Sequence, residues 1–207
     1  MRLYLSSYRL GDATDRLRAL ATGDQAVVVA NALDYSNDVA RKNAGTAREI
    51  SELTELGFSA QEVDLRSYFG DPGALSVRLN NVALIWVVGG NAFLLRRALK
   101  LSGLDEYLWA RKEDTSLLYG GYSAGAVVVT PTLRGIELAD PPSSLAAGYE
   151  PEVVWEGLGL VPYSLAPHYK SAHPDSVLID KVVDYFIENG MPFKTLRDGE
   201  VIICDAS

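Results

Sequence analysis

The most constraining feature of the sequence is an uninterrupted apolar run from Val82 to Val88, VALIWVV. A strand with one face in water alternates apolar and polar residues, whereas a strand of a parallel sheet is covered on both faces and stays apolar. Two glycines follow the run, and then Asn91 to Leu101 has the composition and spacing of a helix with Asn91 as its cap. A buried strand that leads directly into a helix predicts an α/β fold with a mostly parallel central sheet.

Further strands and helices are expected to alternate along the chain. The strands are expected at Arg2 to Leu5, Gln25 to Ala30, Ser59 to Leu65, Ser116 to Tyr119, Gly157 to Pro167, Lys194 to Leu196 and Glu200 to Cys204. The other helices are expected at Asp38 to Leu56, Asp105 to Glu113, Ala126 to Thr130 and Asp175 to Asn189. No repeat, linker or low-complexity tract interrupts them, so we expect a single domain over residues 1–207, with helices on both faces of the sheet in a three-layer sandwich.

Composition excludes several classes of function. The chain has 19 Lys and Arg against 27 Asp and Glu, a formal charge of −8, so nucleic acid is not expected as a partner. A single cysteine, Cys204, cannot form an internal disulfide. The apolar runs are too short to cross a membrane and the first residues show no signal-peptide pattern, so we expect a cytoplasmic protein without a membrane partner.

A candidate nucleophile lies in the segment Gly121 to Gly125, which reads Gly-Tyr-Ser-Ala-Gly between an apolar strand and a segment able to start a helix. In a nucleophile elbow the small residues on either side let neighbouring backbone approach closely, and the turn lifts the hydroxyl clear of the sheet. The turn also directs the amide of Ala124 to the same space, where it can stabilise an oxyanion. We therefore expect Ser123 to be a nucleophile rather than part of an ordinary turn.

A second amide is available after the central strand, at Gly89-Gly90-Asn91. Glycines at the start of a helix expose backbone N–H groups to a ligand. The segment lacks the Gly-Lys-Ser/Thr and Gly-x-Gly-x-x-Gly patterns, so nucleotide binding is poorly supported. Gly90 is the expected second oxyanion donor, and the alternative is a tight turn with an asparagine cap.

Only two histidines can serve as a base. His168 follows Pro167 at the end of an expected strand, which places it at the same edge of the sheet as Ser123. An imidazole there can take the proton of a serine hydroxyl. His173 lies in a polar loop and is interpreted as a solvated side chain. The carboxylate that would orient His168 stays open among three loop residues: Glu137, Asp140 and Asp198.

Three motifs, WVVGGNAFLL, GGYSAGAVVVTP and GLGLVPYSLAPHY, occur in a characteristic order and spacing. With them the chain resembles the peptidase E family of serine aspartyl dipeptidases, which is related to the cyanophycinases. The resemblance extends from Asn31 to the terminal LRDGEVIICD. It implies a fold similar to the class I glutamine amidotransferase domain, which is flavodoxin-like, with serine replacing that domain's cysteine. It also implies a hydrolase that needs no metal or cofactor, and a homodimer.

The resemblance assigns roles by position. Ser123 matches the family's nucleophile, His168 its histidine, and Gly90 with the amide of Ala124 its oxyanion hole. No residue directly matches the family's triad aspartate.

Ungapped counting places Leu138 at the position of that aspartate, so the adjoining Glu137 is the preferred acid and Asp140 the alternative. Asp198 in Leu-Arg-Asp-Gly matches a family glutamate near the active site and is the third candidate.

Specificity is expected to depart from that of the family. Dipeptidases that cleave after an N-terminal Asp carry an arginine in the loop beyond the histidine, as bidentate recognition of a carboxylate requires. The corresponding loop here, Tyr169 to Asp175, has no arginine. Lys170 is a candidate to bind substrate as a point charge, and Asn91 is a second candidate for substrate contact.

The resulting hypothesis is a serine peptidase that hydrolyses small peptides, including Asp-X dipeptides, through Ser123, His168 and a carboxylate. Two alternatives remain: an amidase or esterase on the same scaffold, and a catalytically silent protein that binds a small molecule at the elbow. We also expect the native chain to continue beyond Ser207, because the sequence stops directly after a strand.

Overall fold

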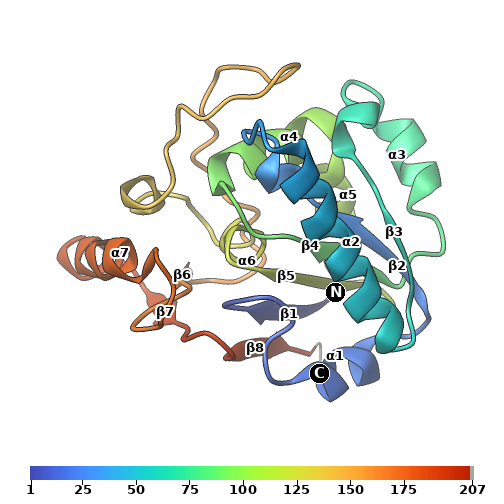
Figure 1. Ribbon diagram of the computed structural model, residues 1–207, viewed down its shortest axis with the longest axis horizontal. Helices are drawn as coiled ribbons and strands as arrows, with labels where there is room; N and C mark the ends of the chain where they lie inside the picture. Colours follow the sequence, from blue (N-terminus) through green and yellow to red (C-terminus); the bar gives the residue numbers. More distant parts are fainter. Residues whose placement is uncertain (206–207) are drawn as a thin grey trace.

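The computed structural model describes residues 1–205, and its central sheet has six strands in the order β3-β2-β4-β5-β1-β8 (Figure 1). The parallel strands are β1 (Arg2–Ser6), β2 (Gln25–Val29), β3 (Ser59–Glu62), β4 (Leu84–Val87) and β5 (Leu118–Tyr122). At one edge, β8 (Val201–Cys204) pairs antiparallel with β1. The predicted α/β class with a mostly parallel sheet is confirmed. The expectation about the end of the chain concerns residues outside the described range.

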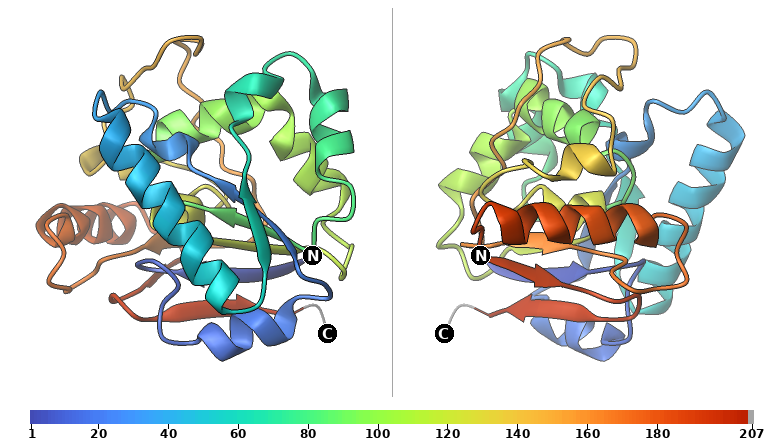
Figure 2. Two further views of the ribbon diagram at one scale, coloured as in Figure 1. Left: turned by 45° about the vertical axis from the view of Figure 1, so that its right-hand side comes forward. Right: turned by 90° about the vertical axis from the view of Figure 1, so that its left-hand side faces the viewer.

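Helices cover both faces of this sheet (Figure 2). One face packs against α1 (Thr14–Leu20) and α2 (Val39–Glu55). The other carries α3 (Pro72–Arg78), α4 (Ala92–Ser102), α5 (Leu104–Ala110), α6 (Ala124–Val127) and α7 (Ser176–Glu188). Successive residues of β4 enter opposite layers, Leu84 and Trp86 on the side of α2, Ile85 and Val87 on the side of α4. This explains why the run is apolar throughout.

A second, two-stranded sheet lies outside the central one. Its strands are β6 (Ser164–Ala166) and β7 (Phe193–Thr195), which pair in parallel. The prediction that the strand before His168 shares a sheet edge with Ser123 is therefore wrong, and only three residues of the expected strand are extended. The turn at residues 197–199 does join two strands, but β7 and β8 belong to different sheets.

Other differences concern short elements. Helices α1 and α3 were not expected from the sequence, because a seven-residue helix shows little periodicity. Asp71 caps α3 through the N–H of Ala74, and Pro72 occupies the first helical turn. The expected strand from Ser59 ends at Glu62 and is followed by a 3-10 helix at Leu65–Tyr68. The expected helices at 105–113 and 126–130 lie at 104–110 and 124–127 instead.

Where β5 passes into α6, the backbone of this turn packs directly against the backbone at the end of β4. A Cβ atom on Gly125 would lie 2.2 Å from the carbonyl oxygen of Val87, and one on Gly121 would lie 3.0 Å from the same oxygen. Only glycine fits at this separation. The elbow is thus held against the end of the central strand by backbone packing.

Replacing Gly125 by alanine is expected to lower the free energy of unfolding by about 3 kcal/mol, because the overlap with Val87 forces backbone to move. The matched control is Gly45→Ala within α2, where no atom lies within 4 Å of the new methyl group. That change is expected to stabilise the protein by about 0.5 to 1 kcal/mol. Urea unfolding measures both; equal effects would contradict the close packing.

Candidate active site

Ser123 lies at the apex between β5 and α6 with backbone angles φ 49° and ψ −117°. A positive φ is unfavourable for a residue with a side chain, and such strain is common at functional positions. The neighbouring backbone is close, since a Cβ on Gly89 would lie 2.9 Å from the Cβ of Ser123. The sequence prediction of a strained elbow agrees with this geometry.

The backbone amides of Gly90 and Ala124, which are the two expected oxyanion donors, have no acceptor among residues 1–205. Gly90 has φ 147°, and a Cβ there would lie 2.5 Å from the carbonyl oxygen of Ala32. A side chain is therefore excluded at the position where the chain turns toward α4. Amides of this kind are suited to stabilise negative charge on a bound group.

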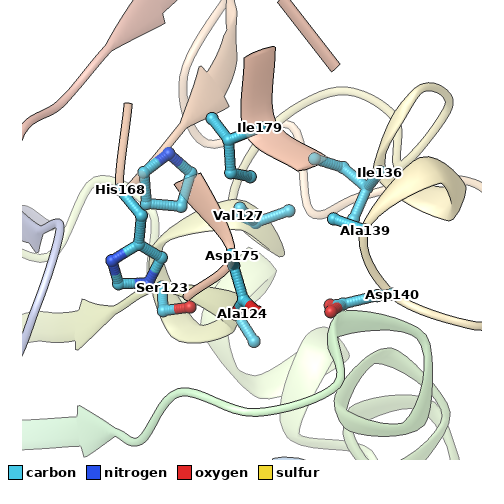
Figure 3. A pocket seen from close by; sticks show the side chains of 10 residues that line it. Ser123, Ala124, Val127, Ile136, Ala139, Asp140, His168, Asp175 and Ile179 are labelled. Carbon is cyan, nitrogen blue, oxygen red and sulfur yellow. The ribbon is translucent and has the colours of Figure 1, made fainter. Parts of the chain in front are cut away.

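His168 follows β6 and is almost fully buried, with 2% of its surface exposed. Its Nδ1 atom lies 2.7 Å from Oδ1 of Asp198. His168 and Ser123 line one pocket (Figure 3), and no hydrogen bond joins their side chains within residues 1–205. The structure therefore brings the candidate nucleophile and the candidate base together, although they belong to different sheets.

Ser7, immediately after β1, forms hydrogen bonds with both His168 and Asp198. Its hydroxyl accepts a hydrogen bond from the main-chain N–H of His168 at 2.8 Å and donates to Oδ1 of Asp198 at 2.9 Å. Ser7 is completely buried. Sequence reasoning missed it; the available signal was a pair of serines after the first strand, where polar residues of a parallel sheet gather.

The preference for Glu137 as the carboxylate beside His168 is corrected by this geometry. Glu137 lies in a 3-10 helix (Ile136–Leu138) and makes no hydrogen bond or ion pair with His168 within residues 1–205. Ungapped counting failed because the carboxylate comes from a turn some sixty residues later in the chain, which the packing of β7 and β8 brings to the ring. Asp198, the third candidate, occupies the position.

Asp140, the second candidate, also makes no bond to His168 but lines the same pocket (Figure 3). Its Oδ2 accepts the N–H of Ala92 at 2.7 Å. Burial raises the pKa of Asp140 to about 7, against the opposing effect of that hydrogen bond.

Asn91 and Lys170 do not line the pocket. Asn91 caps α4 by accepting the N–H of Leu94 at 2.8 Å, and its amide nitrogen donates to the carbonyl of Pro141 at 3.0 Å. The ammonium of Lys170 is exposed and lies 4.9 Å from the centre of the Tyr169 ring. Neither position supports the predicted substrate contact.

His173 stacks on His168, with ring centres 3.7 Å apart and an angle of 13° between the rings. The ring of Tyr8 lies 6.1 Å from His168 and 5.6 Å from His173. The interpretation of His173 as a solvated loop residue is therefore wrong, because the loop folds back over the base.

Burial is the main influence on the pKa of His168 and lowers it; the hydrogen bond to Asp198 opposes this effect, and His173 lowers the pKa further. A lowered pKa keeps the imidazole neutral near pH 7, as a base requires.

Within residues 1–205 no cluster of three or more His, Cys, Asp or Glu side chains is arranged to hold a metal ion. None of the described helices combines the length and the apolar character needed to traverse a bilayer.

Replacing His173 by alanine is expected to raise the pKa of His168, because the change uncovers the ring and removes the electrostatic effect by which His173 lowers that pKa. The titration can be followed by NMR, since His168 is then the one histidine left in the chain. His173→Phe keeps the His168 ring covered but removes the electrostatic effect of His173, and should give a smaller shift. An unchanged pKa in His173→Ala would show that the stacking has no electrostatic effect.

Comparison with known proteins finds a matching family and several related peptidases. The model of peptidase family S51 matches residues 36–206. Peptidase E of Streptomyces coelicolor is 33% identical over 164 residues, which cover 74% of this chain and 59% of that protein. A "Probable alpha-aspartyl dipeptidase" of Drosophila melanogaster is 30% identical over 129 residues, 58% of this chain and 49% of that protein. The chain thus spans about 60% or less of the length of these relatives.

Two solved structures share the fold. A Listeria monocytogenes protein described as a peptidase E superposes with a TM-score of 0.71 at 23% identity, covering 100% of this chain and 98% of that one. A peptidase from an acI-B1 actinobacterium gives a TM-score of 0.67 at 17% identity, covering 98% of this chain and 82% of the other.

Proposed function

The chain belongs to peptidase family S51, and from this membership we propose that it is a serine peptidase that hydrolyses small peptides through Ser123, His168 and Asp198. The observation that carries the proposal is the 2.7 Å contact between Nδ1 of His168 and Oδ1 of Asp198 in the pocket that also contains Ser123. The family supports the reaction class, and the geometry supports these three residues.

Asp198 acts by fixing the tautomer of the base. A carboxylate accepts a hydrogen bond, so the proton of neutral His168 lies on Nδ1 and the lone pair lies on Nε2. Nε2 is then free to take the proton of the Ser123 hydroxyl. The negative charge of Asp198 stabilises the imidazolium that forms.

The proposed reaction has two stages, formation of an acyl-enzyme and its hydrolysis. Oγ of Ser123 attacks the peptide carbonyl carbon while its proton passes to His168, and the amides of Gly90 and Ala124 stabilise the resulting oxyanion. His168 returns the proton to the leaving amine as the C–N bond breaks, which leaves an acyl-enzyme. Water, deprotonated by His168, hydrolyses the ester and restores Ser123.

Small peptides are the proposed substrates. The pocket beside Ser123 is lined by buried apolar side chains from α6 and α7. The alpha-aspartyl dipeptidase name of the Drosophila relative agrees with a short substrate.

The assignment is tested with a panel of dipeptides and a fluorophosphonate probe. Ser123→Ala is expected to abolish hydrolysis and labelling, and Asp198→Asn to lower kcat by about 10³- to 10⁴-fold, because the tautomer of His168 is no longer fixed. Glu137→Gln is the matched control and should retain full activity. Labelled protein that hydrolyses esters but none of the dipeptides would favour the amidase or esterase alternative.

A greater loss of activity in Glu137→Gln than in Asp198→Asn would overturn the assignment of the acid. Absence of both labelling and hydrolysis in the unaltered protein would reject catalysis in favour of a binding role.

A further inference from the structure

The turn after β2 contacts the residue that supplies the second proposed oxyanion donor. The carbonyl oxygen of Ala32, in a 3-10 helix at Asn31–Leu33, accepts the main-chain N–H of Asn91 at 2.9 Å. The same oxygen lies 2.5 Å from the position that a Cβ on Gly90 would take. Gly90 is thus held by a hydrogen bond to the residue that follows it and by backbone contact at its own Cα. The place of Ala32 therefore decides where Gly90 and its N–H lie.

Asn31 holds this turn through its side chain, in a residue that is only 1% exposed. The amide nitrogen donates to Oδ2 of Asp34 at 2.8 Å and to Oδ1 of Asp64 at 2.9 Å. The amide oxygen accepts the main-chain N–H of Leu65 at 3.1 Å. Hydrogen bonds to carboxylates are stronger than those between neutral groups. One buried amide therefore joins the turn after β2 to the turn after the neighbouring strand, β3.

The two carboxylates that accept from Asn31 are themselves held by cations. The side chain of Asp34 is fully buried and pairs with Lys42 of α2. Arg66 donates to both oxygens of Asp64, with its Nη2 atom 2.6 Å from Oδ2. Burial raises the pKa of Asp64, but hydrogen bonds from Arg66 and Asn31 outweigh that effect and lower the pKa to about 2. Asp64 therefore stays a charged acceptor throughout the pH range of an activity assay.

This network is separate from the contacts that hold the proposed base. Neither Asn31 nor its two carboxylate partners line the pocket beside Ser123. Within residues 1–205 none of them forms a hydrogen bond with His168 or Asp198. The described route from Asn31 to the site runs through Ala32 and Gly90, on the oxyanion side. A change at Asn31 should therefore leave the titration of His168 as it is.

We propose that Asn31 is a positioning residue for the reaction, which holds Ala32 and thereby keeps the N–H of Gly90 where the oxyanion forms. This inference rests on the proposed peptidase function. A donor stabilises developing charge well only if it is already in place when the charge forms, because no energy is then spent on moving it. Asn31 supplies this order from the far side of Ala32, without taking part in bond making or breaking.

The first test is Asn31→Asp, which keeps the shape of the side chain but replaces both N–H donors by an oxygen facing Asp34 and Asp64. We expect kcat for a dipeptide to fall about 10- to 100-fold, because loss of a complete oxyanion donor costs about 10²- to 10³-fold. KM and the apparent pKa of kcat/KM should stay the same. Here kcat is expressed per active site, counted from the fluorophosphonate label at completion.

Counting active sites separates positioning from a purely structural role. A structural role would reduce the amount of label, because fewer molecules fold, and would leave kcat per labelled site unchanged; that result would overturn the proposal. Leu53→Ala is the matched control, since it removes a buried side chain between α2 and the sheet and lowers stability away from Ala32. It should keep its kcat per labelled site. An equal loss in this control would also refute the role of Asn31.

A rescue experiment combines Asn31→Asp with Asp34→Asn, which exchanges amide and carboxylate across the 2.8 Å bond. The exchange restores a donor and an acceptor, so part of the lost kcat should return; no recovery would contradict the proposal. If Asn31→Asp does not fold, the double variant decides. Its kcat per labelled site should lie below that of the unaltered protein, because the bond to Asp64 is not restored, and full kcat would overturn the role.

The unaltered protein distinguishes the two levels of the argument. If it is neither labelled nor active, the proposed function fails and the inference fails with it. If it hydrolyses dipeptides and Asn31→Asp retains full kcat per labelled site, the inference alone fails.

Discussion

The close approach of two backbones at the ends of β4 and β5 is the constraint on which the rest of the site depends. Gly125 packs against the carbonyl of Val87, and Gly89 packs against Ser123 itself. With no side chains between them, the strained serine is packed directly against the end of β4. The apolar interior of β4 supplies the fixed support, because its side chains are buried in both layers. A preorganised site of this kind needs little movement when charge develops during a reaction.

Much of the central architecture was predictable from the sequence because its signals are local. A continuous apolar run identifies a buried parallel strand, and the glycines on either side of Ser123 indicate a tight turn that other backbone approaches closely. The site beyond the elbow depends on pairing between remote segments. No local pattern shows that β7 pairs with β6 while β8 joins the central sheet. This pairing places Asp198, rather than Glu137, beside His168. The stacking of His173 was unpredictable for the same reason, since a polar loop has no period that reveals its partner.

The three proposed catalytic residues are held by different means. Ser123 is held by backbone packing, whereas His168 and Asp198 are held by hydrogen bonds that converge on Ser7. Asp140 lines the same pocket, but its carboxyl accepts the N–H of Ala92 at the start of α4 and does not contact the base.

The small β6–β7 sheet has a consequence for how the protein becomes active during synthesis. The elbow is complete once the chain has emerged through α6, but the histidine and its carboxylate arrive only with the last quarter of the sequence. Asp198 precedes β8, which pairs with β1. A partly synthesised chain that stops before β6 therefore contains the serine without the proposed base and its carboxylate. Under the proposed function, proteolytic activity would be withheld from incomplete chains by the order of the strands alone.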